Sequence, residues 1–345
     1  MIERSVRGRV RPRMLLLLMV LAVVAAAVIG WNDYHRFSVA PLNVTTRNES
    51  IDVGRGTSFK GIVAELHQHG FSTANPWYWR LLAEQMHVAG RLHAGEYLLE
   101  PGITPRQLLA NMAAGKVLQR DFTIVDGWTF AQLRQALAHA EKLTHDSATL
   151  DDATIMQKIG AAGEAPEGRF LPETYAYVKG DGDLDILRRA HLAMVKTLAA
   201  LWPGRAKDLP LATPYDALIL ASIVEKETGR ADERAKIAGV FVRRLQDHML
   251  LQTDPSVIYG MGASYTGNIH KSDLTTDTPY NTYTRPGLPP TPIALPGKPA
   301  IEAALHPAPG DALYFVARGD GTHAFASSLA EQNRNVDCYQ RKHCQ

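Results

Sequence analysis

The chain has 345 residues and a net charge of +2, with 46% hydrophobic and 21% charged residues. This composition is typical of a folded protein of two or three domains and excludes a largely disordered chain. The first thirteen residues contribute +4 to the net charge, so residues 14–345 carry −2. Because a slightly acidic body lacks the basic surface that binds phosphate backbones, nucleic acid is not an expected partner.

An apolar run without any charged residue extends from Met14 to Trp31. As a helix it would be about 27 Å long, close to the thickness of a hydrocarbon core, so we predict a transmembrane anchor over residues 14–31. Five arginines in residues 1–13 predict that this N-terminal segment is cytoplasmic. The alternative is a signal peptide cleaved near Ala25-Ala26-Ala27, but the run continues to Trp31, a residue typical of membrane interfaces.

The two cysteines, Cys338 and Cys344, both lie in the last eight residues. In an oxidising compartment they could close a small disulfide loop, or they could remain separate thiols. The sequence contains no Cys/His cluster with the spacing of metal ligands, so we expect neither a metal nor another cofactor.

A pattern of glycine, hydroxyl residue and spaced apolar residues occurs three times in the first half of the chain. The copies are GTSFKGIVAEL, GITPRQLLANM and GWTFAQLRQAL, which begin at Gly56, Gly102 and Gly127. In each copy the hydroxyl residue can cap a helix, and the apolar residues four and eight positions further on share one face. β-rich pieces precede the copies, so the pattern predicts small modules of a strand and a helix.

A helix is predicted from a cap at Thr213 to a stop at Gly229, and it contains the string ASIVEKET. Pro214 suits its first position, and Asp216 suits the third position of a capping box. Apolar residues occupy nearly every side of this helix, so we expect it in the protein core.

Two carboxyl groups, Glu225 and Glu227, lie at the end of this apolar helix. Glu225 shares a face with Ser222 and other small or apolar residues, whereas Glu227 lies about 200° further round. Burial there would raise a carboxyl pKa toward neutrality, as a general acid requires. The alternative is that both are ordinary last-turn residues paired with nearby basic side chains. Helical periodicity cannot choose between them, and being two residues apart they cannot serve one site together.

The segments after residue 249 are rich in glycine, proline, tyrosine and amide side chains. They predict loops that present hydrogen-bonding groups and flat apolar faces on a rigid frame, as sugar-binding surfaces do. The candidate substrate-binding residues are Thr253, Asp254, Asn281, Tyr283 and, on the helix, Ser222. Local turns and caps are the alternative explanation for the loop residues.

Five strings occur in order and with compact spacing: ASIVEKET, ERAKIAGVFVRRL, LQTDPSVIYGMG, YNTYTRPGLPPTPI and LYFVARGDGTHAF. Together they closely resemble the endolytic murein transglycosylase family, MltG/YceG-like. The string PEGRFLPETY stands in place of the family's usual E-G-Y-x-x-P-[DE]-T-Y, so Arg169 is a departure from the family pattern. The cysteine-bearing tail is not part of the pattern.

The resemblance implies an α+β protein with an N-terminal transmembrane helix, a LysM-like module over residues 45–118 and a catalytic domain over residues 119–340. It further implies a single-pass inner-membrane protein whose N-terminus is cytoplasmic and whose catalytic domain is periplasmic. The expected partners are peptidoglycan glycan strands, which the enzyme cuts internally to end strand elongation. Cooperation with bifunctional penicillin-binding proteins is also implied.

The family's catalytic glutamate maps onto the first acid of ASIVEKET, Glu225. It would protonate the glycosidic oxygen between N-acetylmuramic acid and N-acetylglucosamine and then accept the proton of the muramyl 6-hydroxyl, which closes a 1,6-anhydro ring. One carboxyl suffices because the nucleophile is intramolecular. The first rival function is a glycoside hydrolase with Asp254 or Glu173 as second carboxylate. The second is a membrane-anchored scaffold that binds glycan without cutting it.

Overall fold

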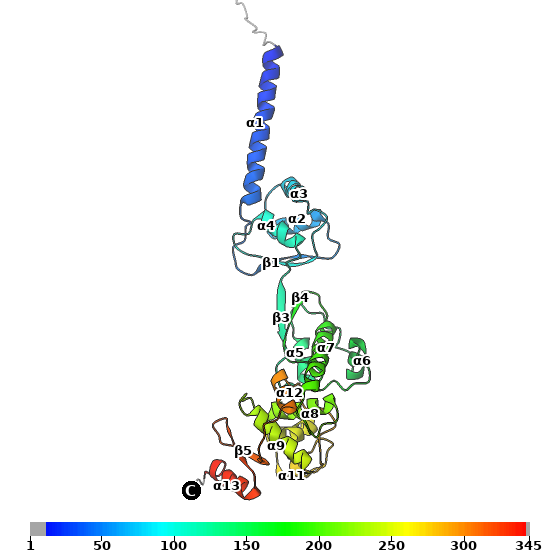
Figure 1. The fold of residues 1–345 in the computed structure, drawn as a ribbon. Coiled ribbons are helices and arrows are strands. Elements are labelled where there is room, and N and C mark those ends of the chain that lie inside the picture. Colours follow the sequence, from blue (N-terminus) through cyan, green and yellow to red (C-terminus); the bar gives the residue numbers. More distant parts are fainter. Residues whose placement is uncertain (1–11, 343–345) are drawn as a thin grey trace, which may run out of the picture. The chain divides into compact units, whose positions relative to one another are not determined.

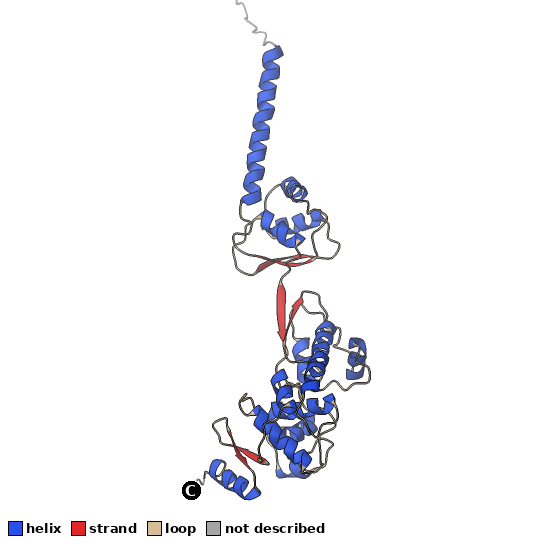
Figure 2. Cartoon of the chain, viewed as in Figure 1, coloured by secondary structure: helices blue, strands red, loops and turns tan. Residues whose placement is uncertain are grey.

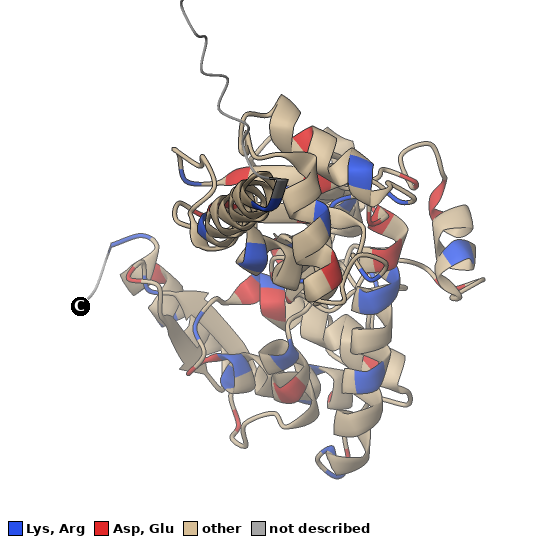
Figure 3. Cartoon of the chain, turned by 90° about the horizontal axis from the view of Figure 1, so that it is seen from above, with Lys and Arg blue, Asp and Glu red and all other residues tan. Residues whose placement is uncertain are grey.

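The computed structural model describes residues 12–342, in which helices predominate and the strands form three separate two-stranded sheets (Figures 1 and 2). This mixture confirms the predicted combination of helix and strand. Residues 1–11 and Cys344, on which two of the predictions fall, lie outside the described residues. The chain divides into two compact units between Gln119 and Arg120. Basic and acidic residues are interspersed along the chain (Figure 3).

Helix α1 (Pro12–Val39) contains the predicted apolar run and continues for eight residues beyond Trp31. It is long and apolar enough to cross a membrane, and its apolar part is not buried by other described residues. Its last turns pack on the first unit: the hydroxyl of Tyr34 donates to Gln85 at 2.5 Å, and the ring of Phe37 contacts Trp79 at 5.2 Å between centroids. The helix therefore joins the first unit without a linker.

The first unit is built on an antiparallel pair of strands, β1 (Glu49–Val53) and β2 (Gly95–Leu99), in which Ile51 lies opposite Tyr97. Its helices are α2 (Phe59–Gln68), α3 (Pro76–Gln85) and α4 (Pro105–Ala113). The strands and helices share one apolar core, in which Trp79 is fully buried.

The three repeated copies begin helices at the predicted caps. Ser58, Thr104 and Thr129 each accept a hydrogen bond from the backbone N–H three residues further on. Thr104 and Thr129 form complete capping boxes with glutamine side chains. The copies do not form one array, because the helices of the first two are α2 and α4 of the first unit, whereas the third begins α5 (Phe130–Ala138) of the second unit.

The second unit begins within strand β3 (Gln119–Thr123), which pairs with β4 (Thr174–Val178). Helices α5, α6 (Asp152–Ile159) and α7 (Asp183–Leu201) surround a core that contains Phe170. A short 3-10 turn (Trp202–Gly204) follows α7.

Helix α8 (Pro214–Glu227) is the central helix of the second unit. Thr213 caps it, with Asp216 completing the capping box as predicted. All eight residues from 217 to 224 are buried, and α9 (Arg234–Gln246) and α12 (Lys298–Leu305) pack against them. The prediction of a core helix is confirmed, although its C-cap is Thr228 and not Gly229.

The remaining elements are shorter. They are α10 (Asp254–Met261), a 3-10 turn (Gly262–Ser264), α11 (Lys271–Thr275), β5 (Tyr314–Ala317), β6 (His323–Ala326) and α13 (Leu329–Tyr339). Strands β5 and β6 form an antiparallel hairpin that packs on α9 on one side and on α13 on the other. Cys338, on α13, is disulfide-bonded.

Candidate active site

A cavity of about 310 Å³ lies where the C-terminal end of α8 meets α9, α10, the β5–β6 hairpin and α13. Its apolar lining comes from residues such as Phe241 and Phe315. The polar and charged residues at the α8 end and around it are Glu227, Arg244, Gln252, Asp254, Tyr283 and His323. A concave site with a few converging polar groups is the expected form of a small binding or catalytic site.

Glu227 is the last residue of α8, and its partly exposed side chain lines the cavity. Burial of its carboxyl raises the pKa of Glu227 to about 7, and the nearby carboxylate of Asp254 acts in the same direction. A hydrogen bond from the hydroxyl of Thr253 and the proximity of His323 oppose this rise. Glu227 can therefore both give and accept a proton near neutral pH.

Thr253 is the N-cap residue of α10, but its hydroxyl does not cap that helix. It donates instead to Oε1 of Glu227, while its side chain is almost fully buried. An N-cap hydrogen bond is typically worth about 1 kcal/mol. The hydroxyl of Thr253 makes a hydrogen bond to the carboxyl instead of this capping bond. We infer that Thr253 orients Glu227.

Asp254 and Tyr283 lie together in the same cavity, since the Tyr283 hydroxyl donates to Oδ1 of Asp254 at 2.5 Å. Burial raises the pKa of Tyr283, and this hydrogen bond raises it further, so the phenol remains a neutral donor. The structure thus brings together three of the predicted substrate-binding residues, Thr253, Asp254 and Tyr283, around Glu227.

Of the five predicted substrate-binding residues, only Asp254 and Tyr283 line the cavity. Thr253 contacts Glu227 without lining the cavity, and Asn281 and Ser222 are absent from the lining as well. Asn281 is buried, and its amide donates to three backbone carbonyls of α11 and the residue that follows it, among them Thr276 at 2.7 Å. Ser222 is fully buried; its hydroxyl donates to Ile219 at 2.7 Å and accepts from the N–H of Ile293 at 3.0 Å. Both side chains hold the backbone in place, which explains their polar character without a sugar.

Glu225 points away from this cavity, as expected for a residue about 200° from Glu227 on the same helix. Its Oε2 accepts the backbone N–H of Gly297 at 3.0 Å, just before α12. Burial raises the pKa of Glu225, the hydrogen bond from Gly297 opposes the rise, and the nearby Asp126 adds to it. The carboxyl of Glu225 therefore connects the end of α8 to the start of α12.

Two further carboxyls of the second unit lie outside the cavity. Glu167 is buried and accepts the N–H of Phe130 at 3.0 Å and the hydroxyl of Tyr259 at 3.0 Å; burial raises its pKa to about 7. Its carboxyl accepts a backbone N–H at the N-terminus of α5 and links this end of the helix to α10. Glu173, the alternative second carboxylate of a hydrolase, is exposed and is not part of the cavity lining.

Arg169, the departure from the family pattern, lies outside the cavity as well. Its guanidinium lies 4.4 Å from the ring centroid of Tyr215 and 3.0 Å from the carboxylate of Glu164. The arginine that replaces the family's tyrosine is thus held by contacts within the second unit.

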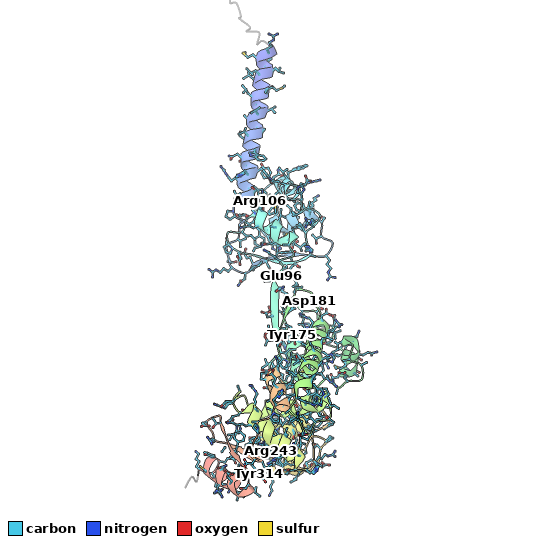
Figure 4. The ribbon with its side chains drawn as sticks, in the orientation of Figure 1. Glu96, Arg106, Tyr175, Asp181, Arg243 and Tyr314 are labelled. Atoms are coloured by element: carbon cyan, nitrogen blue, oxygen red, sulfur yellow. The ribbon has the colours of Figure 1, made fainter. Side chains whose placement is uncertain are left out.

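Sequence analysis missed two of the charged residues of the cavity, Arg244 and His323. The guanidinium of Arg244 donates to backbone carbonyls on both sides, Leu313 at 2.7 Å and Leu251 at 2.9 Å, and lies 5.1 Å from the ring of Tyr314. Figure 4 labels Tyr314 and the neighbouring Arg243 in this part of the second unit. Arg244 lies within ERAKIAGVFVRRL and His323 within LYFVARGDGTHAF, so the signal was present in those strings, but nothing in them indicated that they meet.

Comparison with known proteins places the chain in a family. The sequence profile of the YceG-like family matches residues 51–338, and the chain belongs to this family. It is 31% identical over 270 residues to the endolytic murein transglycosylase of Bacillus subtilis strain 168, a match that covers 73% of this chain and 74% of that protein. The resemblance inferred from the five strings is thereby confirmed.

Two further relatives support this assignment. The endolytic murein transglycosylase of Streptococcus pneumoniae serotype 2 strain D39 is 29% identical over 279 residues, which cover 71% of this chain and 50% of that protein. The crystal structure of a putative YceG-like protein from Listeria monocytogenes superposes with a TM-score of 0.52 at 27% identity, covering 84% of this chain and 99% of that one.

The raised pKa of Glu227 predicts a stability effect that depends on pH. Because the folded-state pKa, about 7, lies above the ordinary 4.5, the carboxyl costs the protein stability as the pH rises from about 4.5 through 7. Glu227→Gln should therefore stabilise the protein at pH 8, by on the order of 1–3 kcal/mol, and have little effect at pH 5. Thermal unfolding at both pH values measures this difference.

The matched control for this measurement is Glu173→Gln, which removes an exposed carboxyl outside the cavity. It should change stability by less than about 0.5 kcal/mol at either pH. Equal effects of Glu227→Gln on stability at pH 5 and pH 8 would show that the pKa of Glu227 does not differ between the folded and the unfolded chain.

Proposed function

We propose that this protein is an endolytic lytic transglycosylase. It cleaves the bond between N-acetylmuramic acid and N-acetylglucosamine within peptidoglycan glycan strands and leaves a 1,6-anhydro-N-acetylmuramic acid end, which terminates the elongation of new strands. The names of the relatives in Bacillus and Streptococcus support this activity. The observation that carries the proposal is the carboxyl of Glu227, with a pKa raised to about 7 by burial, in a polar cavity at the end of a buried helix.

The general acid is assigned to Glu227 on geometric grounds. The match of the family's catalytic glutamate to the first acid of ASIVEKET favours Glu225, which remains the alternative. However, Glu227 is the acid that lies with Thr253, Asp254 and Tyr283, whereas Glu225 contacts the backbone before α12. A general acid needs an open space beside it for the glycosidic oxygen, and the cavity provides that space only on the side of Glu227.

The reaction then needs one carboxyl in two roles. Protonated Glu227 gives its proton to the glycosidic oxygen, the bond to the muramyl anomeric carbon breaks, and the N-acetylglucosamine portion leaves with a new hydroxyl. The carboxylate that results is stabilised by the hydroxyl of Thr253. It accepts the proton of the muramyl 6-hydroxyl as that oxygen bonds to the anomeric carbon, which restores the acid without any water.

Asp254 and Tyr283 supply hydrogen-bonding groups for the sugar next to the acid, and the aromatic side chains of the lining supply apolar faces. Asp254 also fits the alternative function, because a glycoside hydrolase requires a second carboxylate beside the acid. The two reactions differ in their product, because a hydrolase leaves a reducing end.

Substitution of each glutamate by glutamine distinguishes the candidates for the acid. Glu227→Gln should reduce the formation of anhydro-muropeptides by about 1,000-fold or more, because the amide cannot give the proton. Glu225→Gln should retain activity within about tenfold. The measurement is mass spectrometry of the products released from purified peptidoglycan by the full chain in detergent.

The same experiment separates the rival functions. Activity that persists in Glu227→Gln and disappears in Glu225→Gln would transfer the acid role to Glu225. Reducing-end products from the wild type would favour the hydrolase with Asp254. Retention of the protein on insoluble peptidoglycan, with no soluble product, would favour the non-catalytic scaffold.

We further propose that residues 45–118 form a LysM-like module and residues 119–340 the catalytic domain. Each has its own apolar core, and the first contains two helices, α2 and α3, between two paired strands. The chain divides next to residue 119.

The proposed topology is a single-pass inner-membrane protein with a cytoplasmic N-terminus and a periplasmic catalytic domain. The length and apolar character of α1 and the five preceding arginines support it. Protease added to spheroplasts should then degrade the chain beyond α1. Protection of this part from the protease in intact spheroplasts, with degradation only after lysis, would contradict the topology.

Cooperation with bifunctional penicillin-binding proteins follows from the same placement, because an anchored glycan-cleaving domain would meet new strands where they are polymerised. Crosslinking in cells that carry the full chain should recover such a synthase together with this protein. Recovery of the protein without any synthase, at crosslinker concentrations that capture known neighbours of the synthases, would count against the partnership.

A further inference from the structure

A buried glutamate holds the histidine of the cavity in a fixed orientation. Oε2 of Glu233 lies 2.7 Å from Nδ1 of His323, and Oε1 accepts the backbone N–H of the same residue at 3.0 Å. The side chains are 7% and 13% exposed, respectively. A carboxylate that contacts both the ring and the backbone of one histidine leaves the imidazole little rotational freedom.

The position of Glu233 is itself informative. Glu233 is the N-cap residue of α9, yet its side chain makes no capping hydrogen bond, because both oxygens are directed to His323. Burial opposes its ionisation, but the hydrogen bonds from the ring and backbone of His323 outweigh this effect and lower the pKa of Glu233. An ionised Glu233 keeps a proton on Nδ1, and its carboxylate forms an ion pair with the ring when the ring is protonated.

His323 connects this pair to the candidate site. His323 lines the same cavity as Glu227 and is close enough to influence the protonation of that carboxyl. Among residues 12–342, no hydrogen bond involves its Nε2. The titratable and charged groups near these two residues come from α9, α10, the loop before α12 and the segment between α8 and α9: they are Arg244, Asp254, Tyr283, Arg230 and Glu233.

We propose that His323, oriented by Glu233, is a positioning residue of the transglycosylase reaction that places a positive charge beside Glu227 and stabilises its carboxylate during the reaction. This inference rests on the proposed function of the cavity. It explains why a buried carboxylate orients a histidine that lines a site in which only one acid is needed.

The charge is useful at one stage of the reaction. When Glu227 has given its proton to the glycosidic oxygen, the site holds a new carboxylate next to that of Asp254, which repels it. A cationic His323 offsets this repulsion, so the acid gives its proton more readily and the carboxylate persists until it accepts the proton of the 6-hydroxyl. No proton passes through His323 itself.

The direction in which the pH profile changes when the positive charge is removed can be predicted. Without the cation, the pKa of Glu227 should rise, so the pH above which the rate falls should move upward, by about one unit. The maximal rate should fall by about tenfold, because the carboxylate that forms is less stable. His323→Gln and Glu233→Gln should produce the same two changes, since either substitution removes the charge pair.

The experiment measures initial rates of anhydro-end formation by the full chain in detergent, on uncrosslinked glycan strands between pH 5 and pH 9. The control is His306→Gln, which replaces an exposed histidine of the same unit outside the cavity and should leave the pH profile unchanged. Thermal unfolding establishes that each variant is folded. If His323→Gln does not fold, the nearly isosteric Glu233→Gln decides the question.

The inference is overturned if the folded variants keep the wild-type pH profile, whether at the full rate or at a uniformly reduced one. A uniform loss would mean that the pair only stabilises the hairpin. Failure of the proposed function has a different signature, since the wild type itself would then form no anhydro ends at any pH.

Discussion

The geometry of the candidate site depends on one hydrogen bond, from the hydroxyl of Thr253 to the carboxyl of Glu227. It joins the last residue of the buried helix α8 to the first turn of α10, so two elements of the second unit fix one acid. The apolar surroundings of α8 make the ionised carboxyl costly, whereas the hydroxyl reduces that cost. This balance keeps the pKa of Glu227 in the range in which its carboxyl can both give and accept a proton.

Much of the fold follows from local sequence chemistry. The caps at Ser58, Thr104, Thr129 and Thr213 each mark a helix start, because hydroxyl side chains satisfy backbone donors that would otherwise lack partners. The core position of α8 follows equally from its apolar residues on all sides. What these patterns do not contain is the way in which separate segments meet.

The candidate site shows where that limit lies. Periodicity gives the angle between Glu225 and Glu227 but not which side of α8 meets α10 and the β5–β6 hairpin, so the choice required the structure. In the same way, the sequence predicts Asn281 as a sugar-binding residue, yet its amide donates hydrogen bonds to nearby backbone carbonyls. Composition indicates polar groups in loops; only tertiary contacts distinguish those that face a cavity from those that hold the loop.

The absence of a linker after the apolar helix has a mechanical consequence. Because α1 continues as one helix into the contacts of Tyr34 with Tyr78 and of Phe37 with Trp79, its last turns pack directly on α3 of the first unit. Helices that are longer than the local hydrocarbon thickness respond by leaning away from the bilayer normal. In the proposed membrane topology, a thinner bilayer would thus tilt α1 together with the first unit, so that lipid composition would alter the angle at which the unit is presented.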